Sequence, residues 1–237
     1  MARHAPARQV PTTGPLSPRR PARAASEVRI IGGQWKRTRL PVADRPGLRP
    51  TPDRVRETLF NWLGQDLSGW QVLDAFADTG ALGLEAASRG AARVLLAEQD
   101  GPSAQGLQAL VQRLQGAAAV VQVVRGSGIA LLQRQAPASL DLVLLDPPFD
   151  AGLYTQALAA ALPALKPGAW LYLEAPVAWR ESGKVGESND SGPEEAQAQA
   201  PRVPPGLALC RHLQAGAVHA HLFERSASPQ GGQAQAS

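Results

Sequence analysis

The chain has 237 residues, 44% of them hydrophobic, which is enough for one domain with a substantial core and additional tails. No apolar run approaches the roughly 20 residues of a membrane-spanning helix, and the single cysteine, Cys210, excludes an internal disulfide and fits a reducing compartment. We therefore expect a cytoplasmic monomer with no membrane partner and no metal site.

Positive charge is concentrated near the N-terminus. Residues 1–57 contain 13 Lys and Arg against 4 Asp and Glu, a net of +9, whereas the remainder carries a net of −5. This asymmetry favours a polyanionic partner. Residues 1–26 are rich in Pro, Ala and Arg and lack apolar periodicity, so that part predicts a disordered basic tail. The tail lacks acids, as transit peptides do, but its prolines would break an amphipathic helix.

The first structured segment is expected to be a small basic hairpin. Val28–Ile31 predicts a short strand, Gly32-Gly33 a turn, and Trp35–Leu40 a second strand. Lys36, Arg37 and Arg39 lie on this hairpin.

A helix follows the hairpin. Thr51 is a plausible N-cap, with Pro52 at the first helical position. Val55, Leu59, Phe60 and Leu63 then mark an apolar face at helical spacing, which leaves Arg54 and Arg56 off the stripe. Gly64 is the expected stop.

From Trp70 onward, apolar strands alternate with helices, a pattern typical of a parallel sheet covered on both faces. The expected strands are Gln71–Ala75, Arg93–Ala97, Ala119–Val124, Leu140–Leu145 and, after a Pro167-Gly168 turn, Ala169–Leu173. The expected helices are Leu82–Ser88, Ser103–Leu114, Ile129–Gln135 and Tyr154–Leu165.

The C-terminal part predicts an insertion and a hairpin. Residues 180–206 have almost no large apolar groups and predict a flexible insertion. Leu207–Leu213 and Ala217–Phe223 predict two antiparallel strands, and a parallel sheet completed in this way resembles the methyltransferase variant of the doubly wound, Rossmann-like α/β fold, with seven strands. The expected organisation is a tail (1–26), an N-terminal hairpin and helix (27–68), a core (69–179), the insertion (180–206), the hairpin (207–226) and a second tail (227–237).

The turn after the first core strand predicts a nucleotide site. Gly80 and Gly83 allow the backbone to approach a ligand and the helix to pack near the strand. Glu98 ends the next strand 18 positions after Gly80, which suits ribose hydroxyls. A dinucleotide fingerprint would need glycine where Asp78 stands, because a carboxylate there would repel a pyrophosphate. S-adenosylmethionine carries cations, so Asp74 and Asp78 can face it without that penalty.

The most distinctive motif is Asp146-Pro147-Pro148-Phe149, which directly follows an apolar strand. Two prolines stop the strand and leave backbone carbonyls free at the carboxyl edge of the sheet, where such sheets bind ligands. Carboxylate and carbonyl acceptors beside an aromatic ring suit a planar heterocycle that carries an NH2 group. Asp146 and the Pro147 carbonyl would orient that amine, and Phe149 would stack on the base, worth about 1–3 kcal/mol.

Several motifs together resemble the bacterial RsmD family. They are Arg29-Ile30-Ile31-Gly32-Gly33, Arg49-Pro50-Thr51, the block from Arg54 to Asn61, Ala81–Ala86 and Asp146–Phe149. The resemblance runs from about Val28 to Arg225 and implies methylation of the exocyclic N2 amine of a guanine in 16S ribosomal RNA, within a partly assembled 30S subunit.

The resemblance and the motifs together give the candidate site. The expected catalytic residues are Asp146, Pro147, Pro148 and Phe149. The expected S-adenosylmethionine-binding residues are Thr51, Asp74, Phe76, Ala77, Asp78, Thr79, Gly80, Glu98, Gln99 and Ser127. The expected RNA-binding residues are Arg29, Lys36, Arg37, Arg39, Arg49, Arg54 and Arg56.

Two departures from the family leave alternatives open. The family usually has glycine and serine at Asp78 and Thr79, and tends to have Asp or Asn near Ser127, where this chain reads Gly126-Ser127-Gly128. One alternative is therefore a scaffold with impaired cofactor binding that acts as an RNA-binding assembly factor. Another is a methyltransferase for adenine N6 in DNA or a different RNA. An NAD-dependent dehydrogenase is disfavoured by Asp78 and by the lack of a plausible histidine for hydride transfer.

Overall fold

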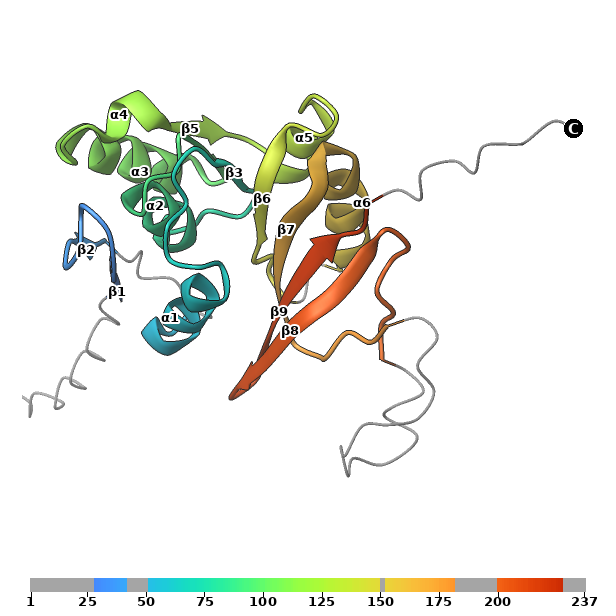
Figure 1. The fold of residues 1–237 in the computed structure, drawn as a ribbon. Coiled ribbons are helices and arrows are strands. Elements are labelled where there is room, and N and C mark those ends of the chain that lie inside the picture. The colour runs from blue at the N-terminus through green and yellow to red at the C-terminus, as the bar shows by residue number, and fades with distance from the viewer. Residues whose placement is uncertain (1–27, 42–50, 150–151, 182–199, 228–237) are drawn as a thin grey trace, which may run out of the picture.

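A computed structural model describes residues 28–41, 51–149, 152–181 and 200–227. Its main sheet has seven strands in the order β5-β4-β3-β6-β7-β9-β8 (Figure 1). The strands are β3 (Gln71–Asp74), β4 (Arg93–Glu98), β5 (Val121–Arg125), β6 (Leu140–Leu145), β7 (Leu165–Ala175), β8 (Leu207–Ala215) and β9 (Val218–Arg225). Strands β3 to β7 pair in parallel, whereas β9 pairs antiparallel with both β7 and β8. The doubly wound fold with a C-terminal antiparallel hairpin is thus confirmed.

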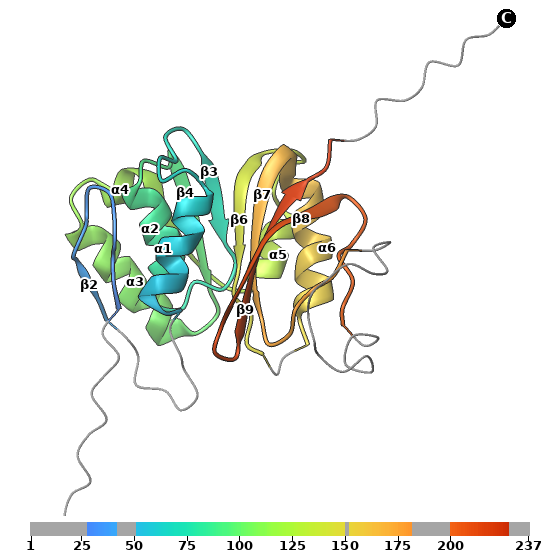
Figure 2. The same ribbon diagram turned by 60° about the horizontal axis from the view of Figure 1, so that its bottom comes forward.

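Helices cover both faces of this sheet (Figure 2). On one face α1 (Asp53–Trp62), α2 (Ala81–Ser88) and α3 (Gly101–Arg113) pack against Leu142, Leu144 and Tyr172. On the other face α5 (Gly128–Gln133) and α6 (Tyr154–Ala164) pack against alternate residues such as Val143, Leu145 and Leu171. Strands buried on both sides must be apolar at every position, which explains their continuous hydrophobic character.

The predicted second strand of the N-terminal hairpin is wrong over most of its length. Only β1 (Val28–Arg29) and β2 (Arg39–Leu40) pair, and the residues between them form bends and turns, with Arg37 at φ +72°. The buried Trp35 explains the difference, because its backbone N–H donates to Ser88 Oγ (2.9 Å) and its indole N–H to the Gln115 carbonyl (3.0 Å). These contacts replace strand pairing.

Helix α1 also begins differently from the prediction. Its N-cap is Pro52, with no side-chain hydrogen bond, so the assignment of Thr51 as the N-cap is wrong. The Thr51 hydroxyl donates instead to a residue far along the chain (2.7 Å to Glu174).

The remaining predicted elements of the core agree with the structure within two residues, apart from two. Helix α4 (Ala117–Val120) precedes β5 and takes residues that were expected to be strand. The predicted turn at Pro167-Gly168 lies inside β7, where the pairing with β6 jumps from Leu165 to Trp170. A bulge therefore accommodates the proline and the positive φ of Gly168 (+76°) without ending the strand.

Most of the predicted tails and insertion lie outside the described residues. The two ends of the insertion meet, because Arg180 N donates to the Pro201 carbonyl (3.0 Å) and Val203 N to the Arg180 carbonyl (2.8 Å). Within the described ranges, no helix is both long and apolar enough to cross a membrane.

Candidate active site

Three neighbouring strands deliver carboxylates to the same edge of the sheet. Asp74 ends β3, Asp146 follows β6, and Glu174 lies near the end of β7. The strand register places them side by side, since Asp74 pairs with Leu144 and Leu145 pairs with Leu173. The carboxyl ends of parallel strands lie at the same edge of a sheet. An acid at or near the end of each of three neighbouring strands therefore gives an acidic cluster there.

The turn between β3 and α2 is organised by Asp74, which is buried. Its two carboxylate oxygens accept hydrogen bonds from the backbone N–H of Phe76 (3.3 Å) and of Gly83 (3.0 Å). A Cβ on Gly83 would lie 2.2 Å from Leu96 of β4, so glycine is what allows α2 to pack this closely. Gly80, at φ +76°, takes the left-handed conformation at the helix start.

Asp78 also has a left-handed backbone, at φ +43°. Asp is one of the few residues that adopts this conformation readily. Asp78 therefore accommodates the left-handed turn of this loop without a glycine. Phe76 and Asp78 are half-buried, whereas Ala77, Thr79 and Gly80 are buried.

The electrostatics of this turn suit a cationic ligand. Burial raises the pKa of Asp74 to about 7, and repulsion from Glu98 and Asp78 adds to the rise. A pyrophosphate would increase this repulsion, whereas a positive charge relieves it. The residues present thus fit S-adenosylmethionine, the expected cofactor, better than a dinucleotide.

Glu98 holds the neighbouring loop in place. Its carboxylate accepts hydrogen bonds from the N–H of Asp78 (2.9 Å) and of Asp100 (2.7 Å). Gln99 is exposed beside it. The position of Glu98 at the end of β4 is the predicted one, and its contact with ribose hydroxyls stays a prediction.

Ser127 caps helix α5, where its hydroxyl accepts a hydrogen bond from Ala130 N (3.3 Å). The side chain is exposed. The next residue, Gly128, lies so close to the end of β3 that a Cβ would meet the carbonyl oxygen of Ala75, the residue after the strand, at 1.8 Å. The loop before α5 therefore borders the turn after β3, the arrangement needed if both contact one cofactor.

The Asp146–Phe149 motif stands at this edge. Asp146 is half-buried, Pro147 is buried, and Pro148 is exposed. The ring of Phe149 is 40% exposed, a high value for an aromatic residue that could have packed into the core. An exposed aromatic ring three residues after Asp146 is available to stack on a planar ligand.

The sequence did not reveal how Glu174 and Tyr172 of β7 contribute to the site. Thr51 Oγ1 donates to Glu174 Oε1 (2.7 Å) and lies 3.4 Å from Asp146 Oδ2. The hydroxyl of Tyr172 donates to the same Glu174 oxygen (2.9 Å). One signal was present, because Glu174 follows a buried apolar strand as Asp74 and Asp146 do. Whether Thr51 also contacts the cofactor stays a prediction.

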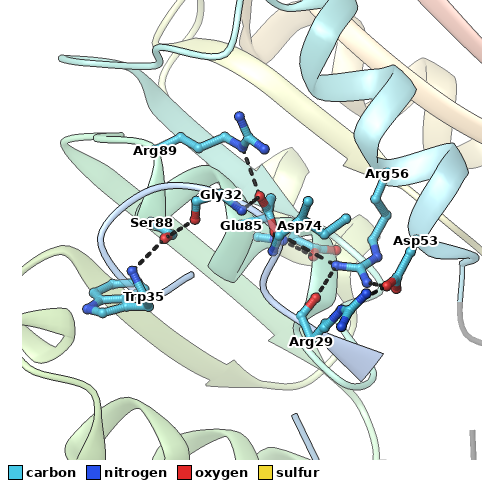
Figure 3. A network of polar contacts seen from close by, with 11 residues as sticks. Arg29, Gly32, Trp35, Asp53, Arg56, Asp74, Glu85, Ser88 and Arg89 are labelled. Carbon is cyan, nitrogen blue, oxygen red and sulfur yellow. Dashed lines mark hydrogen bonds and ion pairs between the residues drawn. The ribbon is translucent and has the colours of Figure 1, made fainter. Parts of the chain in front are cut away.

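Arg56, predicted to bind RNA, is instead fully buried (Figure 3). Its guanidinium donates to the Arg29 carbonyl (2.8 Å) and to Asp53 (2.6 Å), and lies 3.8 Å from Glu85. The prediction is wrong because Arg56 precedes Phe60 by four residues and Leu63 by seven, so it lies on the apolar face of α1.

Glu85 of α2 is the centre of this buried network (Figure 3). Its carboxylate accepts hydrogen bonds from Ile31 N (2.6 Å), Gly32 N (2.7 Å) and Arg89 Nε (2.8 Å). The network thus fastens the N-terminal hairpin and α1 to α2, the helix that begins at the turn after β3.

The other predicted RNA contacts divide into two groups. Arg29, Arg39 and Arg54 are exposed on β1, β2 and the first turn of α1, and Arg29 pairs with Asp53 (3.2 Å). Lys36 and Arg37 are exposed in the hairpin turn, which packs on Ser88 at the far end of α2. They therefore lie at the opposite edge of the sheet from Asp146. Arg49 lies outside the described residues.

A cavity of about 860 Å³ lies at this opposite edge, between the hairpin turn, α1 and the end of α2. Its lining includes Lys36, Glu57, Asn61 and Arg89 and none of the residues at the carboxyl edge. It is therefore separate from the candidate active site.

Solved structures share this fold and the placement of its elements. A putative methyltransferase from Escherichia coli superposes with a TM-score of 0.67 at 35% sequence identity, covering 85% of this chain and 99% of the other. A putative methylase from Haemophilus influenzae gives a TM-score of 0.64 at 31% identity, covering 85% and 100%. The fold and the acidic edge define a class I methyltransferase.

The sequence comparisons narrow this class to one family. The family model described as "Conserved hypothetical protein 95" matches residues 28–190. "Ribosomal RNA small subunit methyltransferase D" of Escherichia coli strain K12 is 40% identical over 203 residues, which cover 86% of this chain and 92% of the relative. The protein of that name from Haemophilus influenzae is 43% identical over 154 residues, covering 64% and 80%. The chain belongs to this family, the RsmD family, as its motifs indicated.

Proposed function

We propose that the protein transfers a methyl group from S-adenosylmethionine to the exocyclic N2 amine of one guanine in 16S ribosomal RNA, in an assembling small subunit. The observation that carries the proposal is the position of Asp146–Phe149 directly beside the turn after β3, in a member of the RsmD family. The 40% identical relative from Escherichia coli is named a ribosomal RNA small subunit methyltransferase, which supports a small-subunit RNA substrate.

The chain would hold its cofactor through the residues that border the turn. S-adenosylmethionine supplies an electrophilic methyl group next to a positive sulfonium. Asp74 and Asp78 would provide the compensating negative charge, Glu98 would accept hydrogen bonds from ribose hydroxyls, and the loop of Ser127 would lie beside the adenine. Because Asp74 is already fixed by two backbone N–H groups, the turn is preorganised before the cofactor arrives.

The task of the Asp146 motif is to orient a poor nucleophile. The lone pair of an amine on guanine is delocalised into the ring, so both N–H bonds need fixed acceptors before the lone pair can face the methyl group. Asp146 and the Pro147 carbonyl provide those acceptors, and Phe149 stacks on the base. Positioning of this kind reduces a barrier by about 7–11 kcal/mol. The base must leave its stack to reach this edge.

The RNA would approach across the N-terminal extension. Arg29, Arg39 and Arg54 are exposed on the hairpin and on the first turn of α1, which directly follows Thr51 at the carboxyl edge. Contacts from these side chains to phosphates position the RNA without reading its sequence. Lys36 and Arg37 face the other edge of the sheet and would contribute less.

Transfer of labelled methyl to 16S RNA in partly assembled small subunits tests the proposal. Digestion of the product to nucleosides should give N2-methylguanosine. N6-methyladenosine would establish the alternative substrate. Calorimetry with S-adenosylmethionine alone should show binding, and its absence would favour the cofactor-impaired scaffold.

A further inference from the structure

Glu174 is an unusual residue for the interior of this protein. It is 2% exposed, and its carboxylate lies near that of Asp146, with Thr51 Oγ1 in contact with both. Burial raises the pKa of Glu174, while hydrogen bonds from Thr51 and Tyr172 and the charge of Arg56 oppose that rise. Two donated hydrogen bonds to one carboxylate favour its ionised form.

The distances from Thr51 Oγ1 indicate which of the two carboxylates accepts its hydroxyl hydrogen. A hydroxyl has a single hydrogen, and the shorter contact, 2.7 Å to Glu174, takes it. Toward Asp146, 3.4 Å away, Thr51 then presents a lone pair. A protonated Asp146 can donate to that lone pair, which completes a chain from Asp146 through Thr51 to Glu174.

We propose that Glu174 is a positioning residue for proton removal, and that through Thr51 it holds on Asp146 the proton that the substrate amine loses. This inference rests on the proposed function and deepens it. The reaction balances as follows: the amine lone pair forms the N–C bond, and the C–S bond breaks with its electrons remaining on sulfur. One N–H bond then breaks with its electron pair returning to nitrogen, and the proton forms an O–H bond on Asp146.

The charged groups around Asp146 and Glu174 favour a proton on Asp146 rather than on Glu174. Burial raises the pKa of Asp146 well above its ordinary value, and the carboxylates of Glu174, Asp74 and Asp78 add to the rise in that order. A hydrogen bond donated by Thr51 would lower it, but the shorter contact to Glu174 takes the hydroxyl hydrogen. Arg56 is the cation that acts on Glu174, from the side of α1, and it favours the ionised form there. Asp146 is therefore the carboxylate of the pair that holds a proton more readily.

The variant Glu174→Gln tests the proposal with little change in shape. The glutamine carbonyl still accepts from Thr51 and Tyr172, but the negative charge beside Asp146 is gone. Because Asp146 must be ionised to accept a proton, kcat falls at low pH as Asp146 becomes protonated. We expect this acid limb to move to lower pH by one unit or more. We also expect the plateau of kcat to fall about tenfold, since a weaker base remains, while KM for the RNA substrate stays within twofold.

A control on the neighbouring strand β6 is Asp141→Asn, which removes a carboxylate at the end of β6 away from Asp146 that pairs with Lys166 (2.7 Å). Its pH profile should match the wild type. A wild-type acid limb and plateau in Glu174→Gln would overturn the proposal.

A second pair of variants covers the case in which Glu174→Gln does not fold. Thr51→Val removes the hydroxyl at nearly constant volume, whereas Thr51→Ser keeps it. The valine variant should shift the acid limb downward and the serine variant should restore it. An upward shift of the acid limb in Thr51→Val would mean that Thr51 donates to Asp146. That result would contradict the proposed series of hydrogen bonds from Asp146 through Thr51 to Glu174.

A measurement without turnover separates this inference from the proposed function. Carboxyl carbon NMR follows the titration of Asp146 in the wild type and in Glu174→Gln. A lower midpoint for Asp146 in Glu174→Gln supports the effect of Glu174 on Asp146 even if no RNA is methylated. In that case only the proposed function fails. An unchanged midpoint in a protein that does methylate RNA would remove Glu174 from the mechanism and leave the function intact.

Discussion

Two groups of charged residues lie near helix α1, and they differ in how their charge is balanced. At Glu85, one carboxylate meets two arginines, Arg56 and Arg89, and two backbone N–H groups. At the carboxyl edge, Asp74, Asp146 and Glu174 gather on neighbouring strands with raised pKa values. The first group is neutralised, whereas the second is left acidic.

The balance of charge distinguishes a group that attaches the hairpin from a group suited to chemistry. The Glu85 carboxylate is already paired with arginines, so it does not require a ligand. Its hydrogen bonds attach the hairpin to the core. Acids that repel one another are destabilising unless something positive or a proton joins them, and such clusters are typical of functional sites. Helix α1 connects the two, since Thr51 precedes it and Arg56 lies within it.

The strongest test of this comparison is Asp146→Ala. We expect methyl transfer to fall by about 10²–10⁴-fold, because the amine loses an oriented acceptor and its base. Binding of S-adenosylmethionine, measured by calorimetry, should persist. Near wild-type transfer would remove Asp146 from the chemistry.

Substitutions in the neutralised group around Glu85 should change the free energy of unfolding instead. Replacing Arg56 with Met leaves the Glu85 carboxylate buried with one arginine fewer, and breaking such a pair lowers the free energy of unfolding by about 3–5 kcal/mol. Urea denaturation measures this change. Arg54→Met, two residues away and exposed, is the matched control and should stay within about 0.5 kcal/mol. Equal effects of the two variants would contradict the structural role of Arg56.

His221 offers a buried titratable group outside both clusters. Burial lowers its pKa to about 4, and its ring accepts a hydrogen bond from Trp179 N (3.0 Å). Between the ordinary pKa of about 6.5 and about 4, the unfolded chain binds a proton that the native chain does not. The free energy of unfolding should therefore fall by up to about 3 kcal/mol as pH drops through this window. Denaturation at several pH values should show the slope, and His221→Gln should flatten it.

The smallest expected effect concerns the exposed arginines. Arg54→Ala should weaken RNA binding and reduce the slope of log affinity against log salt by about 1, the signature of one lost phosphate contact. Lys36→Ala, at the opposite edge of the sheet, should leave the slope unchanged. The reverse result would place the RNA on the hairpin turn and the adjacent cavity.

Much of the fold followed from local patterns. Apolar runs of strand length, helical periodicity and glycine-containing turns predicted the strands and helices of the core, because strands buried on both faces need continuous apolar sequence. The same reasoning placed Asp74, Glu98 and Asp146 at the carboxyl edge, since parallel strands end together. The local pattern predicted the N-terminal hairpin wrongly, because the backbone N–H of Trp35 donates to Ser88 on a distant helix instead of to a neighbouring strand.

The order of the elements, the turn after β3 and the acids that end the strands can all be read from the residues in chain order. The burial of Arg56 against Glu85, and the contact of Thr51 with Glu174 across 123 residues of sequence, become visible in the folded chain alone. The physical reason is that residue type and spacing fix which face a side chain occupies, whereas its partner depends on which distant segment packs against that face. The balance of charge at the active edge is therefore a property of the folded chain.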